Sequence, residues 1–294
     1  MWDIFQNIGN KIAKLTIQNK LVYYEAIGVI LSAIKKEDVL LEAIKVALNQ
    51  LITGWKSFIA SVDVNPDKLK LDDTLLNISF FINVNERLNG CIQDRYTVVF
   101  DVIFNEMVVI YNFYTNSCQA EYAQNRTCIS FYNFKKMRAV KRDILRMFTV
   151  FIEHTKDKQT IAAKYLPSLF NMLKDYKQEP EVLREPELIL LFSKVIDVFE
   201  NVVAGDIPSI LECIFGSTLD LISKDFSSYP DHRVNFFIFL KTVVEKCFQA
   251  LLNIPQEQLE TVINCMIWSI KHDLASIYEV GLESLYALIQ VSSY

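Results

Sequence analysis

The sequence predicts an all-α protein, an α-solenoid built from HEAT-like helical repeats. Apolar residues recur at helical spacing along the whole chain, and only 7 Gly and 7 Pro interrupt its 294 residues. Sandwiches, barrels and βαβ folds need many tight turns, so this scarcity favours long helices joined by short loops. The helix pairs start about 45 residues apart or a little more, close to the HEAT period of about 40–47 residues.

Apolar periodicity predicts about a dozen helices. Their expected ranges are 2–15, 18–34, 37–62, 68–88, 92–122, 132–155, 158–175, 185–204, 206–225, 230–252, 255–272 and 274–291. Prolines 66, 208, 230 and 255 stand where helices are expected to begin, and a proline in the first turn sacrifices no hydrogen bond. Gly205 is expected to end a helix with a positive φ. In one well-patterned helix the stripe Val234, Phe237, Leu240, Val244, Cys247 and Leu251 is expected to be buried, and Arg233 to lie away from it.

The most apolar segment, Tyr96 to Tyr114, is expected to be a water-facing helix. The chain has a mean hydropathy of +0.20, but Asp101 and Glu106 interrupt this segment, and an acid at the centre of a membrane span costs about 2.5–3.5 kcal/mol. A polar stripe of Asp101, Asn105, Asn112 and Asn116 lies opposite an apolar one of Val99, Ile103, Met107, Ile110 and Tyr114. This segregation predicts a soluble protein without membrane insertion.

Charge and composition argue against several functions. A net charge of −5 and a pI near 5.4 leave no broad basic surface, so direct nucleic-acid binding is not expected. A basic cluster is the exception, and it is either a solvated helix face, which we favour, or a partner contact. Its members are Lys135, Lys136, Arg138, Lys141, Arg142 and Arg146.

No motif indicates an enzyme, a cofactor or a metal site. The six cysteines form no CxxC pair, and we expect them to be buried small hydrophobes. His154, His232 and His272 stand alone and are expected to cap helices or lie at the surface. There is no nucleophile elbow, no phosphate-binding glycine loop and no HExxH, so no catalytic residue is nominated.

Several segments resemble one family, the exportin-type nuclear export receptors within the importin-β (karyopherin) family. The most specific segment is Lys224 to Phe237, KDFSSYPDHRVNFF. Further matches, in the family's order, are Tyr24 to Gly28 (YEAIG), Lys136 to Arg142 (KMRAVKR), Arg184 to Glu187 (REPE), Ile267 to His272 (IWSIKH) and Gly281-Leu282. The resemblance spans roughly 18–292, although residues 35–130 match only in helix pattern.

The resemblance implies a nuclear export receptor that shuttles between nucleus and cytoplasm. Its partners would be cargo proteins with leucine-rich export signals and the GTP form of the Ran GTPase, with nucleoporins as further partners. Inner helices of the array would face Ran. It further implies a single HEAT-repeat solenoid over 1–294, a fragment of a longer receptor, with 1–130 around the export-signal groove and 131–294 as C-terminal-type repeats.

By the same resemblance, the helix near 18–34 supplies one wall of the export-signal groove. Tyr23, Ile27 and Ile30 lie at i, i+4 and i+7, so we expect them to share a face and line that groove; the alternative is ordinary packing between repeats. The other wall is expected to lie outside this chain, and none of the six cysteines matches the one that covalent inhibitors modify in the family. Ile27 and Ile30 would then face water, and this chain alone should bind an export signal weakly or not at all.

Two other readings stay open. In the first, the chain is another α-solenoid, either a different transport receptor or an assembly scaffold without Ran dependence. In the second, it is a helical enzyme whose catalytic groups carry no motif.

Overall fold

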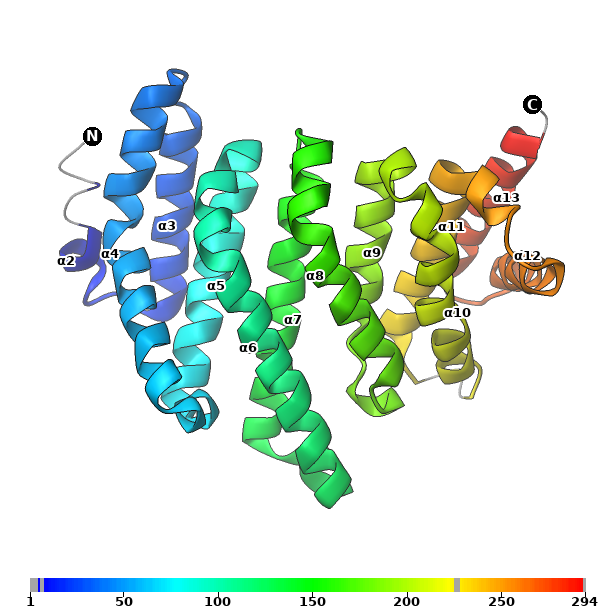
Figure 1. The fold of residues 1–294 in the computed structure, drawn as a ribbon, viewed down its shortest axis with the longest axis horizontal. Coiled ribbons are helices and arrows are strands. Elements are labelled where there is room, and N and C mark those ends of the chain that lie inside the picture. The colour runs from blue at the N-terminus through cyan, green and yellow to red at the C-terminus, as the bar shows by residue number, and fades with distance from the viewer. Residues whose placement is uncertain (1–4, 6–7, 225–227, 293–294) are drawn as a thin grey trace. The chain divides into compact units, whose positions relative to one another are not determined.

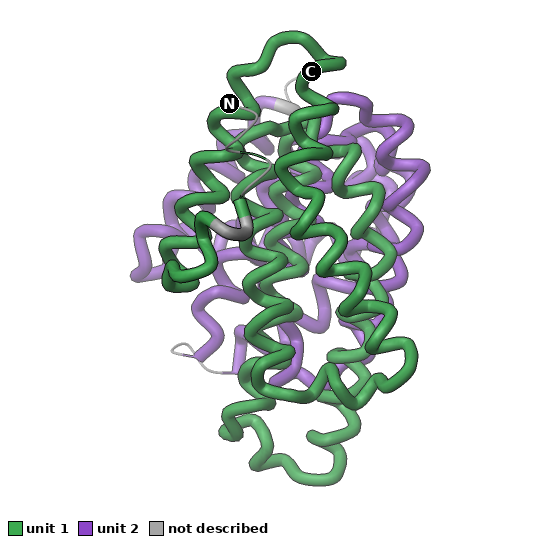
Figure 2. The backbone as a smooth tube through the Cα atoms, turned by 90° about the vertical axis from the view of Figure 1, so that its left-hand side faces the viewer, with its two compact units in different colours: residues 1–154 green, residues 155–294 purple. Residues whose placement is uncertain are grey.

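The computed structural model describes residues 5, 8–224 and 228–292. Every regular element in this part of the chain is an α-helix or a 3-10 turn, which confirms the predicted all-α solenoid (Figure 1). The chain divides into two compact units, residues 1–154 and 155–294, coloured separately in Figure 2.

The first unit stacks helices in two layers. Its elements are α2 (Ile8–Ile12), α3 (Ile17–Ser32), α4 (Glu37–Val64), η1 (Pro66–Lys70), α5 (Asp72–Ile92), η2 (Gln93–Tyr96), α6 (Thr97–Gln124), η3 (Arg126–Ser130) and α7 (Tyr132–Glu153). Helices α3, α5 and α7 pack side by side in one layer, and α6 packs against α7 from the other layer, which also contains α4. Part of the predicted helix 2–15 lies outside the described residues.

This unit contains a repeat of 60 residues. Helices α4 and α6 each have 28 residues and start at Glu37 and Thr97, while α5 and α7 start at Asp72 and Tyr132. The links agree as well, because Asn65 and Asn125 share a φ of −146° and cap the 3-10 turns η1 and η3. Their Oδ1 atoms accept the N–H of Asp67 at 3.2 Å and of Thr127 at 3.0 Å. The period exceeds the expected 45 residues because α4 and α6 are so long.

The second unit has shorter helices in the same alternation. Its elements are α8 (Lys158–Gln178), η4 (Glu181–Leu183), α9 (Pro186–Phe199), η5 (Glu200–Val202), η6 (Ala204–Asp206), α10 (Ile207–Ser223), α11 (Pro230–Leu251), α12 (Gln256–Ile270) and α13 (Ala275–Ser292). Helices α9, α11 and α13 form one layer, α10 packs on α8 and α11, and α12 packs on α13. The predicted end at Gly205 is wrong, because α9 stops at Phe199 and the positive φ, 42°, falls on Glu200.

The apolar helix α6 is amphipathic, as predicted. The helical stretch Asp72–Gln124 contains a window long and apolar enough, by length and composition alone, to cross a membrane, and 44% of that window is buried inside the protein. Asp101, Asn105 and Asn116 are exposed and Asn112 is half-buried. The opposite stripe of Val99, Ile103, Met107, Ile110 and Tyr114 is buried.

Two charged residues lie in the core against expectation. Lys141 is fully buried on α7, with its Nζ 5.3 Å from the centroid of the Tyr111 ring, so the prediction of a solvated face is wrong at this position. Arg233 is also buried and donates to the carbonyl of Ile222 at 2.9 Å. The cysteines follow the prediction: five are buried and Cys91 is half-buried, all as free thiols.

Candidate functional site: two apolar surfaces and a motif network

Helix α3, the expected groove wall, is fixed at both ends. At its start Thr16 accepts the N–H of Asn19 at 3.3 Å, which satisfies one of the free donors of the first turn. At its end Arg95 reaches back from η2 and donates to the carbonyls of Ser32 at 3.1 Å and Ile34 at 3.0 Å. The guanidinium thereby holds the last turn of α3 at a defined place beside α6.

The three predicted groove residues lie at different depths on α3. Ile27 is 2% exposed and belongs to the core, so the expectation that it faces water is wrong. Tyr23 and Ile30 are half-buried. Two exposed apolar side chains of this helix stand one position before Tyr23 and Ile30, at Val22 (53% exposed) and Val29 (57% exposed), and a third, Ile17, lies at its start. The groove-lining role of Tyr23, Ile27 and Ile30 stays a prediction.

Close packing against α5 accounts for the burial of this part of α3. A Cβ added at Gly28 would lie 2.8 Å from the Cβ of Cys91, which leaves no room for a larger side chain. The neighbouring Tyr24 is buried, and its ring meets Phe80 edge-on at 6.4 Å. This packing buries Tyr24, Ile27 and Gly28, whereas Tyr23 and Ile30 keep part of their surface exposed.

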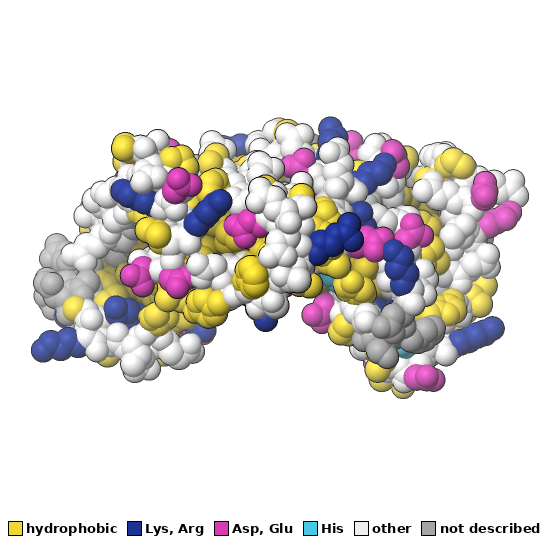
Figure 3. All heavy atoms as spheres, turned by 90° about the horizontal axis from the view of Figure 1, so that it is seen from below, with side chains coloured by type: hydrophobic (Ala, Val, Ile, Leu, Met, Phe, Trp, Pro, Cys, Tyr) yellow, Lys and Arg dark blue, Asp and Glu magenta, His cyan; other side chains and the backbone are white. Residues whose placement is uncertain are grey.

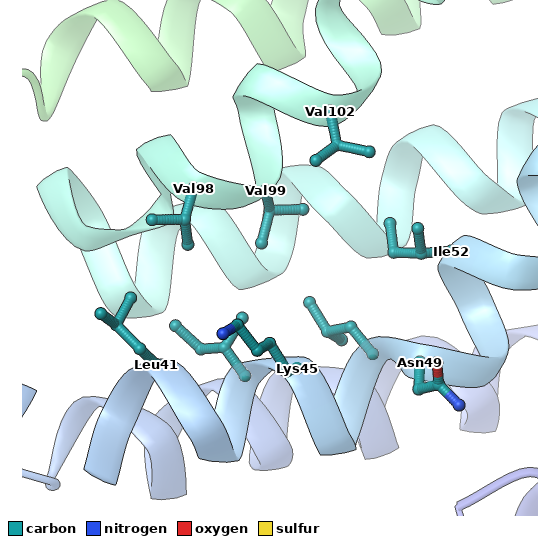
Figure 4. A pocket seen from close by; sticks show the side chains of 9 residues that line it. Leu41, Lys45, Asn49, Ile52, Val98, Val99 and Val102 are labelled. Atoms are coloured by element: carbon teal, nitrogen blue, oxygen red, sulfur yellow. The ribbon is translucent and has the colours of Figure 1, made fainter. Parts of the chain in front are cut away.

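A deeper apolar groove lies between α4 and α6 (Figure 4). It encloses about 620 Å³ and is lined by Leu41, Ile44, Lys45, Leu48, Asn49, Ile52, Val98, Val99 and Val102. Leu41 lies across from Val98 at one end, and Ile52 from Val102 at the other. The sequence reasoning missed this groove, although Val98 and Val102, 43% and 41% exposed, stand one helical turn apart on a helix whose opposite face is buried.

A polar contact joins α4 and α6 beyond Ile52. The indole Nε1 of Trp55 donates a hydrogen bond to the Glu106 carboxylate, and the same indole stacks on Phe81 at 4.0 Å. Burial raises the pKa of Glu106, while the Trp55 hydrogen bond and Lys56 oppose the rise. The groove can therefore accept apolar side chains, with Lys45 and Asn49 as its polar contacts, but it presents no nucleophile or acid–base pair.

In the second unit Arg184 joins the end of α8 to the interior of α10. Its Nε donates to the carbonyl of Tyr176 at 3.2 Å, Nη2 to that of Lys177 at 3.1 Å, and Nη1 to that of Ser217 at 3.1 Å. Tyr176 and Lys177 end α8, and Ser217 lies on α10. The rigid guanidinium fork can serve three carbonyls at once, which a lysine ammonium cannot do in this geometry.

The segment His232 to Asn235 packs onto the same place. His232 places Nε2 3.1 Å from the carbonyl of Arg184, and Asn235 donates to the carbonyl of Pro186 at 2.9 Å. Two of the segments that resemble exportins, Arg184 to Glu187 and Lys224 to Phe237, therefore touch one another. Residues 225–227 of the second segment lie outside the described residues. These motif residues stabilise the repeat junction.

The remaining histidine prediction holds in part. Nδ1 of His272 accepts the N–H of Leu274 at 3.1 Å, as a capping residue would, although the side chain is buried. His232 is also buried and contacts the carbonyl of Arg184 instead. Among the described residues no group of three or more His, Cys, Asp or Glu side chains is arranged to hold a metal ion.

Comparison with known proteins gives consistent relatives. Exportin-1 of Schizosaccharomyces pombe is 28% identical over 289 residues, which is 98% of this chain and 27% of that protein. Protein EXPORTIN 1B of Arabidopsis thaliana is 28% identical over 91% of the chain, and Exportin-1 of Drosophila melanogaster is 26% identical over 98%. The chain thus spans about a quarter of the length of these relatives. The family described as CRM1 C terminal matches residues 100–293, and the chain accordingly belongs to the CRM1 C-terminal family, resembling the corresponding portion of exportin-1.

Proposed function

We propose that this chain acts as a segment of a nuclear export receptor, which binds cargo proteins with leucine-rich export signals together with Ran in its GTP form. The observation that carries the proposal is the similarity to proteins named exportin-1 across 98% of the chain. The proposed role is that of a binding protein without catalysis, shuttling between nucleus and cytoplasm.

Two surfaces of the first unit support a binding role. The α4–α6 groove offers an apolar lining on which a helix of a partner can place residues at i, i+4 and i+7. Tyr23 and Ile30, with Ile27 beneath them, are proposed to line one wall of the export-signal groove.

The proposal is tested in cells that express the chain. Depleting every polypeptide that carries this sequence should move a fluorescent reporter with a leucine-rich export signal from the cytoplasm into the nucleus. Re-expression of the same polypeptide should restore the cytoplasmic signal, and a reporter with its leucines replaced by alanine serves as the control. A reporter that remains cytoplasmic after depletion would contradict the export function.

The alternative is an α-solenoid transport receptor or assembly scaffold without Ran dependence. A pull-down of cargo with Ran locked in its GTP or GDP form distinguishes this alternative from the exportin function. Equal recovery of cargo with both forms would favour the scaffold, and recovery with the GTP form alone would favour the exportin.

A further inference from the structure

The link between α6 and α7 exposes large apolar side chains among cations. Ile129, Phe131 and Tyr132 are 42%, 51% and 60% exposed. Arg126, Lys135 and Lys136 stand among them, and Lys136 places Nζ 5.4 Å from the centroid of the Tyr132 ring. We call these six residues the α6–α7 tip. Figure 3 shows hydrophobic side chains interspersed with Lys and Arg and with Asp and Glu.

The residue that precedes α7 is a half-exposed aromatic one. Phe131 occupies the N-cap, where a Ser, Thr, Asp or Asn side chain would satisfy a free backbone N–H, and it makes no such hydrogen bond. Its aromatic ring is half exposed, so it contributes only part of its area to packing. Leu71, the equivalent N-cap before α5, is also apolar and 57% exposed, so what distinguishes the start of α7 is an exposed aromatic pair beside cations.

The charges at the same helix start run against the helix dipole. The first turn of α7 contains no acid, and Lys135 and Lys136 follow directly, although the positive end of a helix favours acidic side chains. The matching helix of the preceding repeat, α5, follows the rule with Asp72 and Asp73 in its first turn. The two helices begin 60 residues apart in equivalent positions, so the fold accepts acids at this place and the cations of α7 are not required by it.

The tip has a strong local charge imbalance. Between residues 121 and 136 the three cations face one acid, Glu121. Within the described residues none of the three forms an ion pair with a carboxylate, and Arg126 and Lys136 instead lie over tyrosine rings at 6.0 Å and 5.4 Å. Exposed aromatic residues and arginine are also the side chains most enriched in protein interfaces.

From these observations we propose that the α6–α7 tip is a docking surface for an acidic peptide segment that carries aromatic or leucine side chains. The peptide's carboxylates pair with Arg126, Lys135 and Lys136, while its apolar side chains cover Phe131 and Tyr132. This surface is separate from the groove residues of α3 and from the α4–α6 groove.

An extended polyanion or an anionic membrane fits the first unit less well. The preceding link, around η1, carries four acids, Asp63, Asp67, Asp72 and Asp73, against two cations, Lys68 and Lys70. It lies beside α6, because the Tyr114 hydroxyl donates to the carbonyl of Leu69 at 2.9 Å. A membrane or a nucleic acid would meet these acids as well as the cations, whereas a short peptide can bind the α6–α7 tip alone.

The experiment measures fluorescence anisotropy of the full chain with labelled synthetic peptides. The binding probe is a peptide of acidic residues with one phenylalanine and one leucine; the comparison peptides are a version without apolar residues and a version with lysines in place of the acids. We expect binding by the first peptide, weakening with added salt. Lys135→Glu with Lys136→Glu should weaken it by about tenfold or more, a change that corresponds to about 1.4 kcal/mol.

A matched pair of N-cap variants separates binding from folding. Phe131→Ser should raise the thermal midpoint, because serine caps the helix, and should lower the affinity for the acidic peptide. Leu71→Ser, at the equivalent position before α5, should also raise the midpoint but leave the affinity unchanged. Equal effects of the two variants on binding would overturn the proposal.

Three further outcomes would also overturn it. The first is equal binding of the acidic and lysine peptides, and the second is no binding of the acidic peptide at any salt concentration. The third is selective binding to single-stranded RNA, or to vesicles of phosphatidylcholine and phosphatidylserine, that the double charge variant loses. In the last case the tip would serve a different class of partner.

Discussion

At the scale of single residues, Gly28 shows how closely two helices meet. An alanine there would place its Cβ 2.8 Å from the Cβ of Cys91, both on rigid helical backbone. We expect Gly28→Ala to lower the free energy of unfolding by about 1–3 kcal/mol in urea titrations. Gly54→Ala is the matched control, since a Cβ there meets nothing within 4 Å and helix propensity should add about 0.5–1 kcal/mol. Equal shifts in the two variants would contradict this packing argument.

Arg184 joins three main-chain carbonyls of the second unit through one guanidinium group. Replacing it with methionine keeps much of its volume but removes donors to three carbonyls. We expect a loss of about 3 kcal/mol in unfolding free energy, because hydrogen bonds from a charged donor contribute about 1.5–3 kcal/mol each and are not additive. Arg87→Met, which removes an exposed ion pair with Glu25, should cost less than about 1 kcal/mol. A comparable loss at both positions would show that the carbonyl contacts of Arg184 contribute little.

At the scale of elements, the α5–α7 interface should respond to pH. Burial raises the pKa of Glu86 above its ordinary 4.5, Asp143 adds to the rise, and Arg146 and Arg87 oppose it. The folded chain therefore keeps this proton in a pH range where the unfolded chain has lost it, so stability should fall as pH rises from 4.5 through the folded pKa. Glu86→Gln should flatten that fall, measured by urea unfolding from about pH 4 to about pH 7. The same slope in both proteins would show that Glu86 does not control it.

The sequence predicted the helices well and their junctions less well. Periodicity located α4, α10 and α11 to within a few residues, because their apolar stripes are regular. It placed a helix start at 92, whereas α6 begins at Thr97 after a 3-10 turn in which Gln93 has a φ of 55°. No Gly or Pro marks that turn, so the sequence carried no signal for it.

Charged side chains limited the prediction of the surfaces. Lys141 and Arg233 were expected at the surface from their chemistry, yet the structure provides a tyrosine ring for one and a carbonyl for the other. Such partners come from distant parts of the chain, which a local pattern does not reveal. The burial of Ile27 has the same origin, since its surroundings include α5.

At the scale of the whole molecule, the location of the groove residues bears on what the chain binds. With Ile27 in the core and Tyr23 and Ile30 half-buried, α3 presents a shallow surface to a helical peptide. We expect a labelled leucine-rich export signal to bind the isolated chain with a Kd weaker than about 10 μM, that is, with less than about 7 kcal/mol. Fluorescence anisotropy with an alanine-substituted peptide as control checks this, and saturable submicromolar binding would refute it.

The network around Arg184 also determines which residues are free to vary. Arg184, Arg233 and Asn235 donate from their side chains, but every acceptor named for them is a main-chain carbonyl, at Tyr176, Lys177, Ser217, Ile222 and Pro186. A substitution at an acceptor position keeps its carbonyl, whereas a substitution at a donor position removes the bond itself. The junction therefore requires particular side chains at a few donor positions and tolerates replacement at most of the surrounding ones. A short block of sequence can then stay similar between relatives while the rest of such a repeat diverges.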